Sequence, residues 1–572
     1  MKRQSLLVLL TVVLVGLYYH WCSRITGAQF TSEADLPGYY NYLGRSLLAG
    51  KLSLPVEPAP ELLALPDPWD PQKNGPWRLH DAVLFEGKHY LYHGGAPALL
   101  LFAPWRKLTG RDLPHHFGLL LIVFAAFLFW TGAIIRVAGM ERANPLVLVC
   151  VALCSGVPYL LNRVEAYEIA IGGGLLCVAG GMFFLTGRQW IASGIFFGMA
   201  LACRPHMAIV GLLAAGYILW TERGSFQPLL RFCVPLLCCF GLAAAYNYAR
   251  FRDPLEFGVR YLLAGDRSQQ HIVWSLRNIP TGLYYYLWSP PELEPVFPWL
   301  RLTLRFPWPN HLFPPNYFLE ATMGVLFAAP VVILAFRSRQ PLAKFAALSG
   351  VVILIYLLGT GLTTHRYFLD FVPLLLFAAV LGYDQVPRWL FVSLALVGCL
   401  ANMALGVIGP YDDYLRKRPD SYLRLAGWFS PLPEHRPVDL PSFRVTLSGQ
   451  TAPMPDGIRQ PLLSVGRQVH RYVLYQEHAR GQIQLISHTD AANVIAASGL
   501  PEAAPHALEL AYDSPTRVLS IRTDASSPVQ HATGRLITAP SQIRIGEQLA
   551  DYFLTVPRFV GKVEATAGQI PR

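Results

Sequence analysis

Long apolar runs limit what this chain can fold into more than any other feature of its sequence. Over the first 409 of its 572 residues, apolar runs alternate with polar connections. A helix that crosses a bilayer needs about 20 consecutive, mainly apolar residues. We therefore predict a polytopic α-helical membrane protein with about eleven spans, at residues 5–21, 116–136, 144–161, 166–186, 190–203, 205–220, 229–249, 318–336, 342–361, 367–383 and 388–409.

The composition supports this interpretation and sets a limit to it. The chain is 53% hydrophobic and 15% charged, whereas soluble domains carry about 25% charged residues. A wholly soluble enzyme is therefore excluded, yet the mean hydropathy of +0.35 is too low for a chain made of spans alone. The net charge of +11 fits basic cytoplasmic loops beside anionic lipid better than nucleic-acid binding.

Positive charge orients the predicted spans. If the N-terminus is cytoplasmic, every short basic connection falls on the cytoplasmic side, as the positive-inside rule requires. An odd number of spans then places the C-terminus on the opposite face. The basic residues at these cytoplasmic ends are Lys2, Arg3, Arg136, Arg142, Arg188, Arg223, Arg231, Arg337, Arg339, Lys344 and Arg388.

This topology divides the chain into four parts. Residues 1–22 form an N-terminal transmembrane anchor, for which a cleaved signal peptide is the alternative. Residues 23–115 form a first outer loop. Residues 116–410 form the transmembrane bundle, with a second outer loop at about 250–317, and residues 411–572 form an outer domain.

The outer segments carry their own patterns. Helical spacing of apolar residues from Tyr39 to Leu48 predicts an amphipathic surface helix that ends near Gly50. The segment VLFEGKHYLYHG predicts a hairpin. From Phe443 to Ala567, short alternating runs such as FRVTLSG and GQIQLISH predict eight to ten strands in an all-β sandwich.

Acidic residues in the first outer loop are the first candidates for chemistry. Glu33 and Asp35 follow the first span closely, and a carboxylate there could deprotonate a hydroxyl or bind a metal. A solvated acidic pair is the alternative. Asp81 and Lys88 flank the predicted hairpin. Neither this region nor the nine cysteines, all in or beside apolar runs, has zinc-ligand spacing.

Other candidates lie at the outer ends of predicted spans, where a buried charge is costly and often functional. Glu165 and Glu168 share a helical face at the start of one span, as a helix cap or as part of a substrate site. Arg204 precedes Pro205, and it could clamp a phosphate through two parallel hydrogen bonds or extend to the lipid headgroups.

The segment THRYFLDFVP begins another predicted span on its outer side. It contributes His365, Arg366 and Asp370 to the candidate substrate-binding residues. Because residues 366 and 370 are four apart, they could pair on one helical face. Asp370 lies about one turn into an otherwise apolar helix, and this position favours a function for it.

These features together resemble the GT-C superfamily of polytopic membrane glycosyltransferases, which includes protein O-mannosyltransferases and the aminoarabinose transferases of lipid A. The resemblance covers about residues 1–410. It consists of an N-terminal span, a long first outer loop with an early acidic residue, and many spans with outer loops between them. Three stretches are similar to bacterial members of the group: HDAVLFEGKHYLYHGGAPALLLFAPWRKLTG (80–110), NYARFRDPLEFGVRY (247–261) and THRYFLDFVP (364–373).

The resemblance implies an inverting glycosyltransferase in the inner membrane of a bacterium, with the C-terminal domain in the periplasm. A sugar would move from a polyprenyl-phosphate donor to a glycan, lipid or protein acceptor. Asp35 would act as the base, with Glu33 as its substitute, and Asp81 would hold the acceptor or a metal. In place of the Asp-Glu pair of the O-mannosyltransferases, this chain has Glu33-Ala34-Asp35.

The same resemblance gives the basic residues a role. Arg204 and Arg366, and more weakly Lys88, would neutralise the departing phosphate. Some relatives use a divalent metal, but no ligand set in this sequence requires one, and we expect no nucleic-acid partner.

Two other classes of function stay open. A transporter or flippase for a lipid-linked saccharide would share the basic outer ends but should carry polar groups through the whole membrane depth, where this chain is nearly all apolar. A membrane-anchored scaffold whose β domain binds glycan is the other alternative. The sequence has no P-loop, nucleotide-binding glycine motif or nucleophile elbow, so ATP, NAD and serine-hydrolase chemistry have no support.

Overall fold

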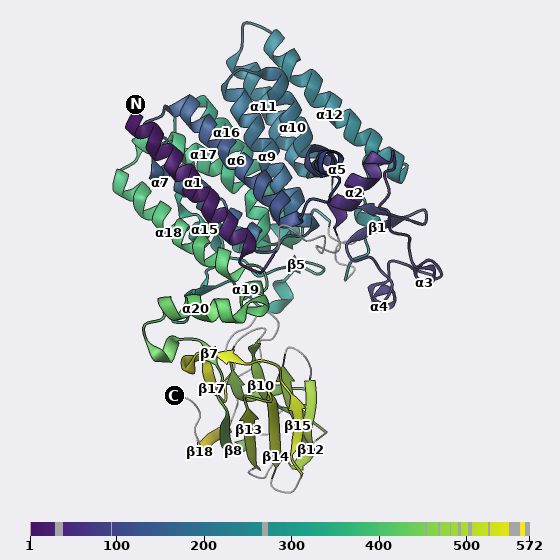
Figure 1. Cartoon of the computed structure of the whole chain (residues 1–572), viewed down its shortest axis with the longest axis vertical. Helices are drawn as coiled ribbons and strands as arrows, with labels where there is room; N and C mark the ends of the chain where they lie inside the picture. Colours follow the sequence, from purple (N-terminus) through teal and green to yellow (C-terminus); the bar gives the residue numbers. More distant parts are fainter. Residues whose placement is uncertain are drawn as a thin grey trace. The chain divides into compact units, whose positions relative to one another are not determined.

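The computed structural model divides the chain into two compact units, shown in Figure 1. The helical unit comprises Met1–Pro291 and Leu304–Pro410, and the β unit comprises Glu292–Thr303 and Tyr411–Arg572. Residues 292–303, which the sequence analysis assigns to the second outer loop, thus belong to the β unit. The described residues are 2–28, 38–92, 94–265, 273–451, 455–466, 470–480, 482–489, 493–501, 506–523, 527–547 and 561–566.

Six helical stretches among the described residues are long and apolar enough to cross a membrane. Each coincides with a predicted span, and their length and composition make this a helical membrane protein. They contain α1 (Lys2–Arg24), α6 (His115–Ala138), α9 (Ala166–Thr186), α12 (Gln227–Phe251), α16 (Pro341–Gly359) and α18 (Arg388–Ile408).

Three further predicted spans are shorter apolar helices. They are α10 (Trp190–Leu201), α11 (Ala208–Thr221), which follows the 3₁₀ turn η2 (Pro205–Met207), and α17 (Val372–Leu381), which follows the 3₁₀ helix η8 (His365–Asp370). A helix of 12 residues, such as α10, rises only about 18 Å.

Two predicted spans are interrupted helices, so the prediction of one continuous helix in each of these runs is wrong. The run 144–161 divides into α7 (Pro145–Leu153) and α8 (Val157–Asn162), and the residue that precedes α8, Gly156, has a left-handed φ of 87°. The run 318–336 divides into a short strand, α15 (Val325–Ala328) and the 3₁₀ helix η7 (Pro330–Phe336). Pro330 has no amide hydrogen to continue the hydrogen bonds of α15.

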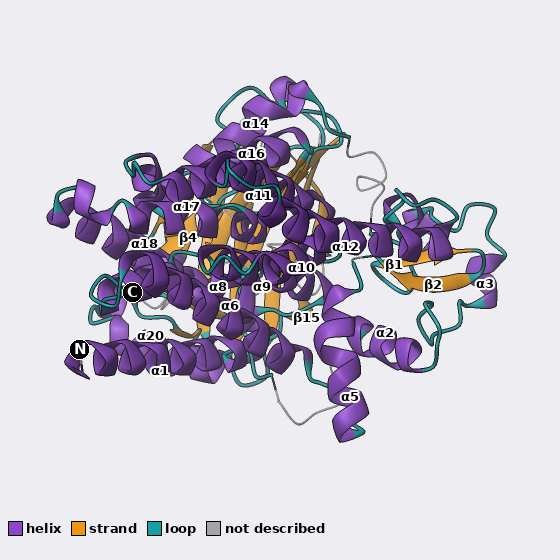
Figure 2. Cartoon of the chain, turned by 90° about the horizontal axis from the view of Figure 1, so that it is seen from above, coloured by secondary structure: helices purple, strands orange, loops and turns teal. Residues whose placement is uncertain are grey.

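Loops of the helical unit hold smaller elements, seen from above in Figure 2. As predicted, the first outer loop contains a helix over residues 39–48 and a hairpin. Its elements are α2 (Tyr39–Leu48), α3 (Pro60–Leu63), α4 (Pro71–Asn74), β1 (Ala82–Phe85), β2 (Lys88–Leu91), η1 (Ala98–Phe102) and α5 (Ala103–Thr109). Later loops contribute η3 (Val259–Tyr261), η4 (Leu276–Asn278), α14 (Ile279–Leu283), η5 (Tyr284–Trp288), β5 (Phe318–Leu319) and β6 (Leu362–Thr363).

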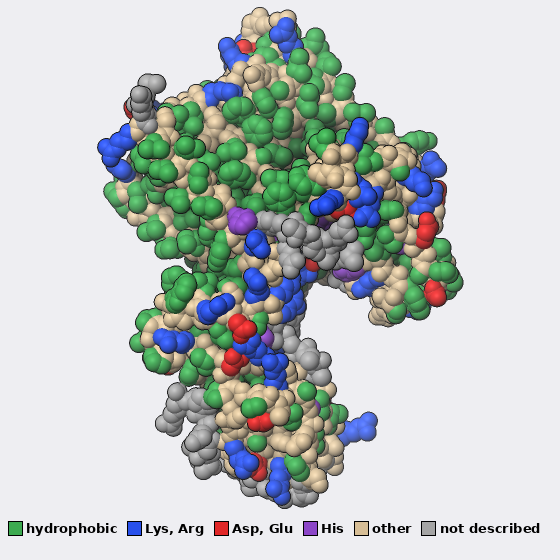
Figure 3. Space-filling view, viewed as in Figure 1, with side chains coloured by type: hydrophobic (Ala, Val, Ile, Leu, Met, Phe, Trp, Pro, Cys, Tyr) green, Lys and Arg blue, Asp and Glu red, His purple; other side chains and the backbone are tan. Residues whose placement is uncertain are grey.

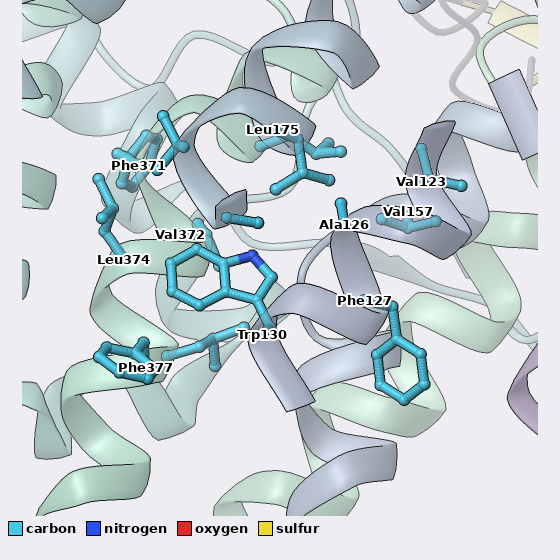
Figure 4. Packing of buried hydrophobic residues seen from close by; sticks show 14 of the residues in the cluster. Val123, Ala126, Phe127, Trp130, Val157, Leu175, Phe371, Val372, Leu374 and Phe377 are labelled. Atoms are coloured by element: carbon cyan, nitrogen blue, oxygen red, sulfur yellow. The ribbon is translucent and has the colours of Figure 1, made fainter. Parts of the chain in front are cut away.

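The helical unit has an apolar surface as well as an apolar core. Hydrophobic side chains cover most of its visible face in Figure 3, and Leu14 of α1, Leu242 of α12 and Leu400 of α18 are exposed. Inside, Trp130 of α6 packs against Phe377 of α17, with 5.1 Å between the ring centroids (Figure 4). Apolar residues on both sides of a helix are typical of a bundle in lipid.

The β unit contains two five-stranded antiparallel sheets, in the orders β12-β11-β10-β9-β17 and β15-β14-β13-β8-β18. Leu447 and Leu510 of one sheet belong to the same buried cluster as Leu474 and Leu485 of the other. The predicted β-rich C-terminal region is thus confirmed. The strands are β8 (Phe443–Thr451), β9 (Arg459–Val465), β10 (Tyr472–Ala479), β11 (Gln482–Thr489), β12 (Asn493–Pro501), β13 (His506–Asp513), β14 (Val518–Thr523), β15 (Val529–Ala532), β17 (Ile543–Ile545) and β18 (Gly561–Thr566).

Candidate functional site

Arg204 forms a buried ion pair inside the helical unit. It follows the end of α10, where Pro205 starts η2. Its Nη2 lies 2.8 Å from Oδ2 of Asp370 in η8, and the two residues are only 5% and 2% exposed. Nε2 of His206 lies 3.0 Å from the same carboxylate oxygen. A buried charge is stable only when it is paired, so Asp370 holds Arg204 in this position.

Arg366 forms a second charged group one turn before Asp370. Its Nη1 lies 2.8 Å from Oε1 of Glu168, and its Nη2 lies 2.6 Å from Oε1 of Glu320. Aromatic rings cover both arginines, with the Arg366 guanidinium 5.0 Å from the Tyr167 ring and that of Arg204 4.3 Å from the Tyr367 ring. Such stacking adds to the stability of a desolvated guanidinium.

The pair that the spacing suggests between Arg366 and Asp370 does not form. Residues 365–370 are a 3₁₀ helix, which has 3.0 residues per turn. A four-residue spacing therefore separates two side chains by about 120° around the axis, whereas an α-helix separates them by about 40°. Each residue pairs instead with a distant partner, Arg366 with Glu168 and Asp370 with Arg204.

Glu165 and Glu168 close the N-terminus of α9 as a capping box. Oε2 of Glu168 accepts a hydrogen bond from the backbone N–H of Glu165 at 2.9 Å, and the Glu165 side chain accepts one in return from the Glu168 backbone. Glu165 also accepts from Nε of Arg163 at 2.8 Å. Glu165 and Glu168 had been interpreted either as a helix cap or as part of a substrate site. The helix cap is present, and Glu168 also binds Arg366.

Asp81 lies beside these charges at the start of β1. Its φ of 59° is left-handed, a conformation that costs energy for a residue other than glycine. A backbone hydrogen bond to Leu263 O, 3.0 Å long, holds it there. Burial raises the pKa of Asp81 above its ordinary value, and Glu165 raises it further, while His80, Tyr167 and Arg366 lower it.

The Tyr92 hydroxyl lies within electrostatic range of both Asp81 and Arg204. We call Asp81, Arg163, Glu165, Glu168, Arg204, Glu320, Arg366 and Asp370 the charged cluster. It contains three arginines and five carboxylates, so its net charge is −2 when the histidines are neutral. A phosphate would therefore meet arginines whose charge is already balanced. Arg204 and Arg366 each still have an Nε that finds no hydrogen-bond partner among the described residues.

Two predicted site residues do not reach the charged cluster. Lys88 has an exposed side chain at the tip of the hairpin, opposite Phe85, whereas Asp81 adjoins the other end of β1. At about 3.3 Å per strand residue, the two ends lie roughly 10 Å apart. His365 is buried between the rings of Tyr159 and Phe368, at 4.8 and 4.5 Å between centroids. Glu33 and Asp35 lie outside the described residues.

An apolar cavity of about 330 Å³ opens beside the end of α10. Its wall includes Gly94 and Gly95 of the first loop, Ala202 at the end of α10, and Leu242 and Tyr246 of α12. Ala202 is two residues from Arg204. The Tyr246 hydroxyl is buried without a hydrogen-bond partner among the described residues, so it can donate to a ligand in the cavity.

Sequence reasoning missed three residues of this site. Glu320 lies in the predicted span 318–336 and was not selected as a candidate, although it is the one acidic residue in the run YFLEATMGVLF. Tyr167 lies two residues after Glu165, and His206 lies two residues after Arg204. A tyrosine or histidine beside a charge is too common to indicate a site. A lone acid in an apolar run is the signal that could have identified Glu320.

A metal site is not evident in this region. Within the described ranges, no group of three His, Cys, Asp or Glu side chains is arranged to hold a metal ion. The chain matches no protein-family model and no curated protein.

Proposed function

We propose that this protein is an inverting glycosyltransferase of the GT-C type, which moves a sugar from a polyprenyl-phosphate donor to an acceptor hydroxyl. One observation carries the proposal. The largely buried carboxylate of Asp81 lies within electrostatic range of Arg366, and the Tyr92 hydroxyl lies within electrostatic range of both Asp81 and Arg204. An apolar cavity that fits part of a lipid chain reaches Ala202, two residues from Arg204. Transfer from a lipid-phosphate sugar needs a carboxylate for the acceptor proton, arginines for the phosphate and an apolar space for the lipid chain, all close together.

The chemistry assigns a task to each group. The acceptor oxygen attacks the anomeric carbon as the bond from that carbon to the phosphate oxygen breaks, and the carboxylate takes the acceptor proton. The polyprenyl phosphate leaves as an anion, so no strong general acid is required. Arg204 and Arg366 offer their unpartnered Nε–H groups to the phosphate.

Asp81 is the base that the described residues favour. Of the five carboxylates in the charged cluster, the other four each pair directly with an arginine. Among the residues that the structure describes, Asp81 has only His80 at ion-pair distance, 3.6 Å away. A carboxylate without an arginine partner keeps more basicity for proton transfer. Asp35 and Glu33 stay the alternatives for this role that the family resemblance implies.

We further propose the finer topology that the resemblance suggests. About eleven segments cross the inner membrane of a bacterium, the N-terminus is cytoplasmic, and the β unit is a periplasmic sandwich. The shorter helices α10, α11 and α17 would cross the membrane by packing inside the bundle. Cysteine labelling at residues 108 and 337 from each side of sealed vesicles tests the orientation.

The decisive experiment compares two carboxylates of the same hairpin region. The Asp81 side chain is only 17% exposed and the Glu86 side chain is 56% exposed, yet both residues have a left-handed backbone. In membranes supplied with radiolabelled polyprenyl-phosphate hexose or pentose, Asp81→Asn should lower transfer by roughly 100-fold or more, as the loss of a general base does. It should keep donor binding. Glu86→Gln should leave both unchanged.

Two outcomes would redirect the proposal. If Asp81→Asn transfers sugar as well as Glu86→Gln, Asp81 is not the base, and Asp35→Asn becomes the next variant to measure. If the wild-type protein moves the donor between leaflets and transfers no sugar, the flippase alternative replaces the transferase.

A further inference from the structure

An exposed aromatic patch marks one surface of the β unit. Trp428 is 82% exposed, and Trp299, Phe429 and Leu432 expose about half of their surface. We call these four residues the aromatic patch. Large exposed aromatic residues in one place indicate a surface that meets another apolar or interfacial partner.

The aromatic patch is held by a firm local structure. It joins α20 (Pro419–Phe429) to the loop between β3 (Glu292–Leu293) and β4 (Leu300–Arg301). The Phe297 ring, which is buried, stacks on Phe429 at 5.5 Å, and the Trp299 ring lies 5.9 Å from Phe429.

Hydrogen bonds and an ion pair fasten the same two segments. Tyr422 donates a hydrogen bond of 2.7 Å to the Phe297 carbonyl, and buried Arg301 donates one of 2.6 Å to Asp412. Trp428 and Trp299 are therefore exposed on a fixed surface.

Basic side chains accompany the aromatic ones. Helices α19 (Asp413–Lys417) and α20, with Arg418 between them, carry four basic and two acidic residues, a net charge of +2. Arg424 lies four residues before Trp428, and the two side chains share the outward face of α20, opposite buried Tyr422 and Ala426. The exposed basic residues are Arg416, Lys417, Arg418 and Arg424, of which Arg416 and Lys417 also pair with Asp413. This is the composition of helices that lie in the headgroup layer of a membrane.

The number of residues between α18 and α20 limits how far the patch can lie from the membrane. Helix α18, an apolar candidate span, ends at Ile408, and α20 begins at Pro419 with α19 between them. With about 3.6 Å for an extended residue and 1.5 Å for a helical one, α20 starts at most about 30 Å from the end of α18. Trp428 lies nine residues further along α20, so the patch is at most about 45 Å from the end of α18 and can reach the membrane that holds this helix.

We propose that the aromatic patch and its basic neighbours rest on the anionic phospholipid headgroups of the membrane that the apolar helices cross. The Trp rings lie at the interface, and the four basic side chains face lipid phosphates. This contact restricts the β unit to the membrane surface. It does not depend on the chemistry of the charged cluster, so it can be correct even if the proposed transferase activity is wrong.

Photocrosslinking of the full-length protein in lipid nanodiscs tests the contact. Trp428→p-benzoylphenylalanine places the probe on the patch. A control probe replaces Arg522, an exposed residue of β14 that lies opposite Glu509 of β13. In phosphatidylglycerol discs, mass spectrometry should find several-fold more lipid adducts at 428 than at 522. Monodisperse gel filtration of both variants shows that they are folded.

A charge variant tests the basic part of the proposal. Arg424→Gln should lower the adduct yield at 428 about fivefold in phosphatidylglycerol discs, the effect of one basic residue at an anionic surface, and should change it little in phosphatidylcholine. Arg522→Gln is the matched control and should leave the yield unchanged. Equal yields at 428 and 522 would overturn the proposal. So would adducts to a second copy of the chain in place of lipid, because the patch would then be a protein interface.

Discussion

Arg204 and Asp370 are 166 residues apart in the sequence and form an ion pair of 2.8 Å in the interior of the helical unit. The first residue follows the end of a short helix, and the second ends a 3₁₀ helix. This pair, with the Arg366 group one turn away, connects helices α9, α10 and α17 around the candidate site.

Asp370→Asn should destabilise the protein strongly. The substitution leaves Arg204 buried without a carboxylate partner, which costs roughly 3–5 kcal/mol. The midpoint of thermal unfolding in detergent measures the loss. Asp384→Asn breaks the half-exposed pair between Arg142 and Asp384 and should cost at most about 1 kcal/mol. Equal shifts in the two variants would show that burial does not set the strength of these pairs.

Two substitutions at Glu168 should separate its role as a cap from its role as an ion-pair partner. Glutamine can still accept from the Glu165 N–H but carries no charge for Arg366, whereas alanine loses both interactions. Glu168→Ala should therefore be less stable than Glu168→Gln by about 0.5–2 kcal/mol, the usual value of a cap. Denaturation curves of both variants in one detergent give the difference, and identical curves would contradict the capping role.

Transfer should depend on pH through Asp81. A base must be ionised, and burial raises the pKa of Asp81, so the carboxylate takes up a proton at a higher pH than an exposed aspartate would. Activity should therefore disappear as the pH falls through this raised value, and it should be constant above it. Initial transfer rates across the acid range measure the profile. Glu86→Gln should keep the same profile, and an acid limb at the pKa of an exposed aspartate would exclude Asp81.

Gly94→Ala should disturb the cavity and the position of Arg204. A methyl group at Gly94 would overlap the Ala202 carbonyl oxygen, two residues from Arg204. The first loop would have to move away from α10, where Ala96 N now donates a 3.2 Å hydrogen bond to the same oxygen.

We expect Gly94→Ala to bind a fluorescent isoprenoid phosphate at least about tenfold more weakly, a loss of about 1.4 kcal/mol. Gly216→Ala is the matched control, since open space surrounds that position in α11. It should bind normally and be slightly more stable, because alanine favours helix. Normal binding by Gly94→Ala would mean that the cavity does not hold the lipid.

Local patterns predict the helices of this protein well. The predicted span 166–186 coincides with α9, and the expected helix over residues 39–48 coincides with α2. Both rest on contacts between residues close in sequence, where the apolar pattern and the helix stops decide the result. Prediction failed at residues 318–336, where an apolar run of sufficient length is interrupted at Pro330.

The sequence identified charged residues of the site but not their partners. It selected Arg204, Arg366, Glu168 and Asp370 as unusual because charges in apolar surroundings are costly. The only partner that spacing along a helix suggested for Arg366 was Asp370, because this spacing relates only residues that are close in the sequence.

The sequence alone therefore determined that this chain is a helical membrane protein with a β-rich end, since apolar length and periodicity are local properties. Only the tertiary structure decided that Arg204 meets Asp370 and that Arg366 meets Glu168 and Glu320. Those partners come from segments far apart in the chain, and helix packing brings them together.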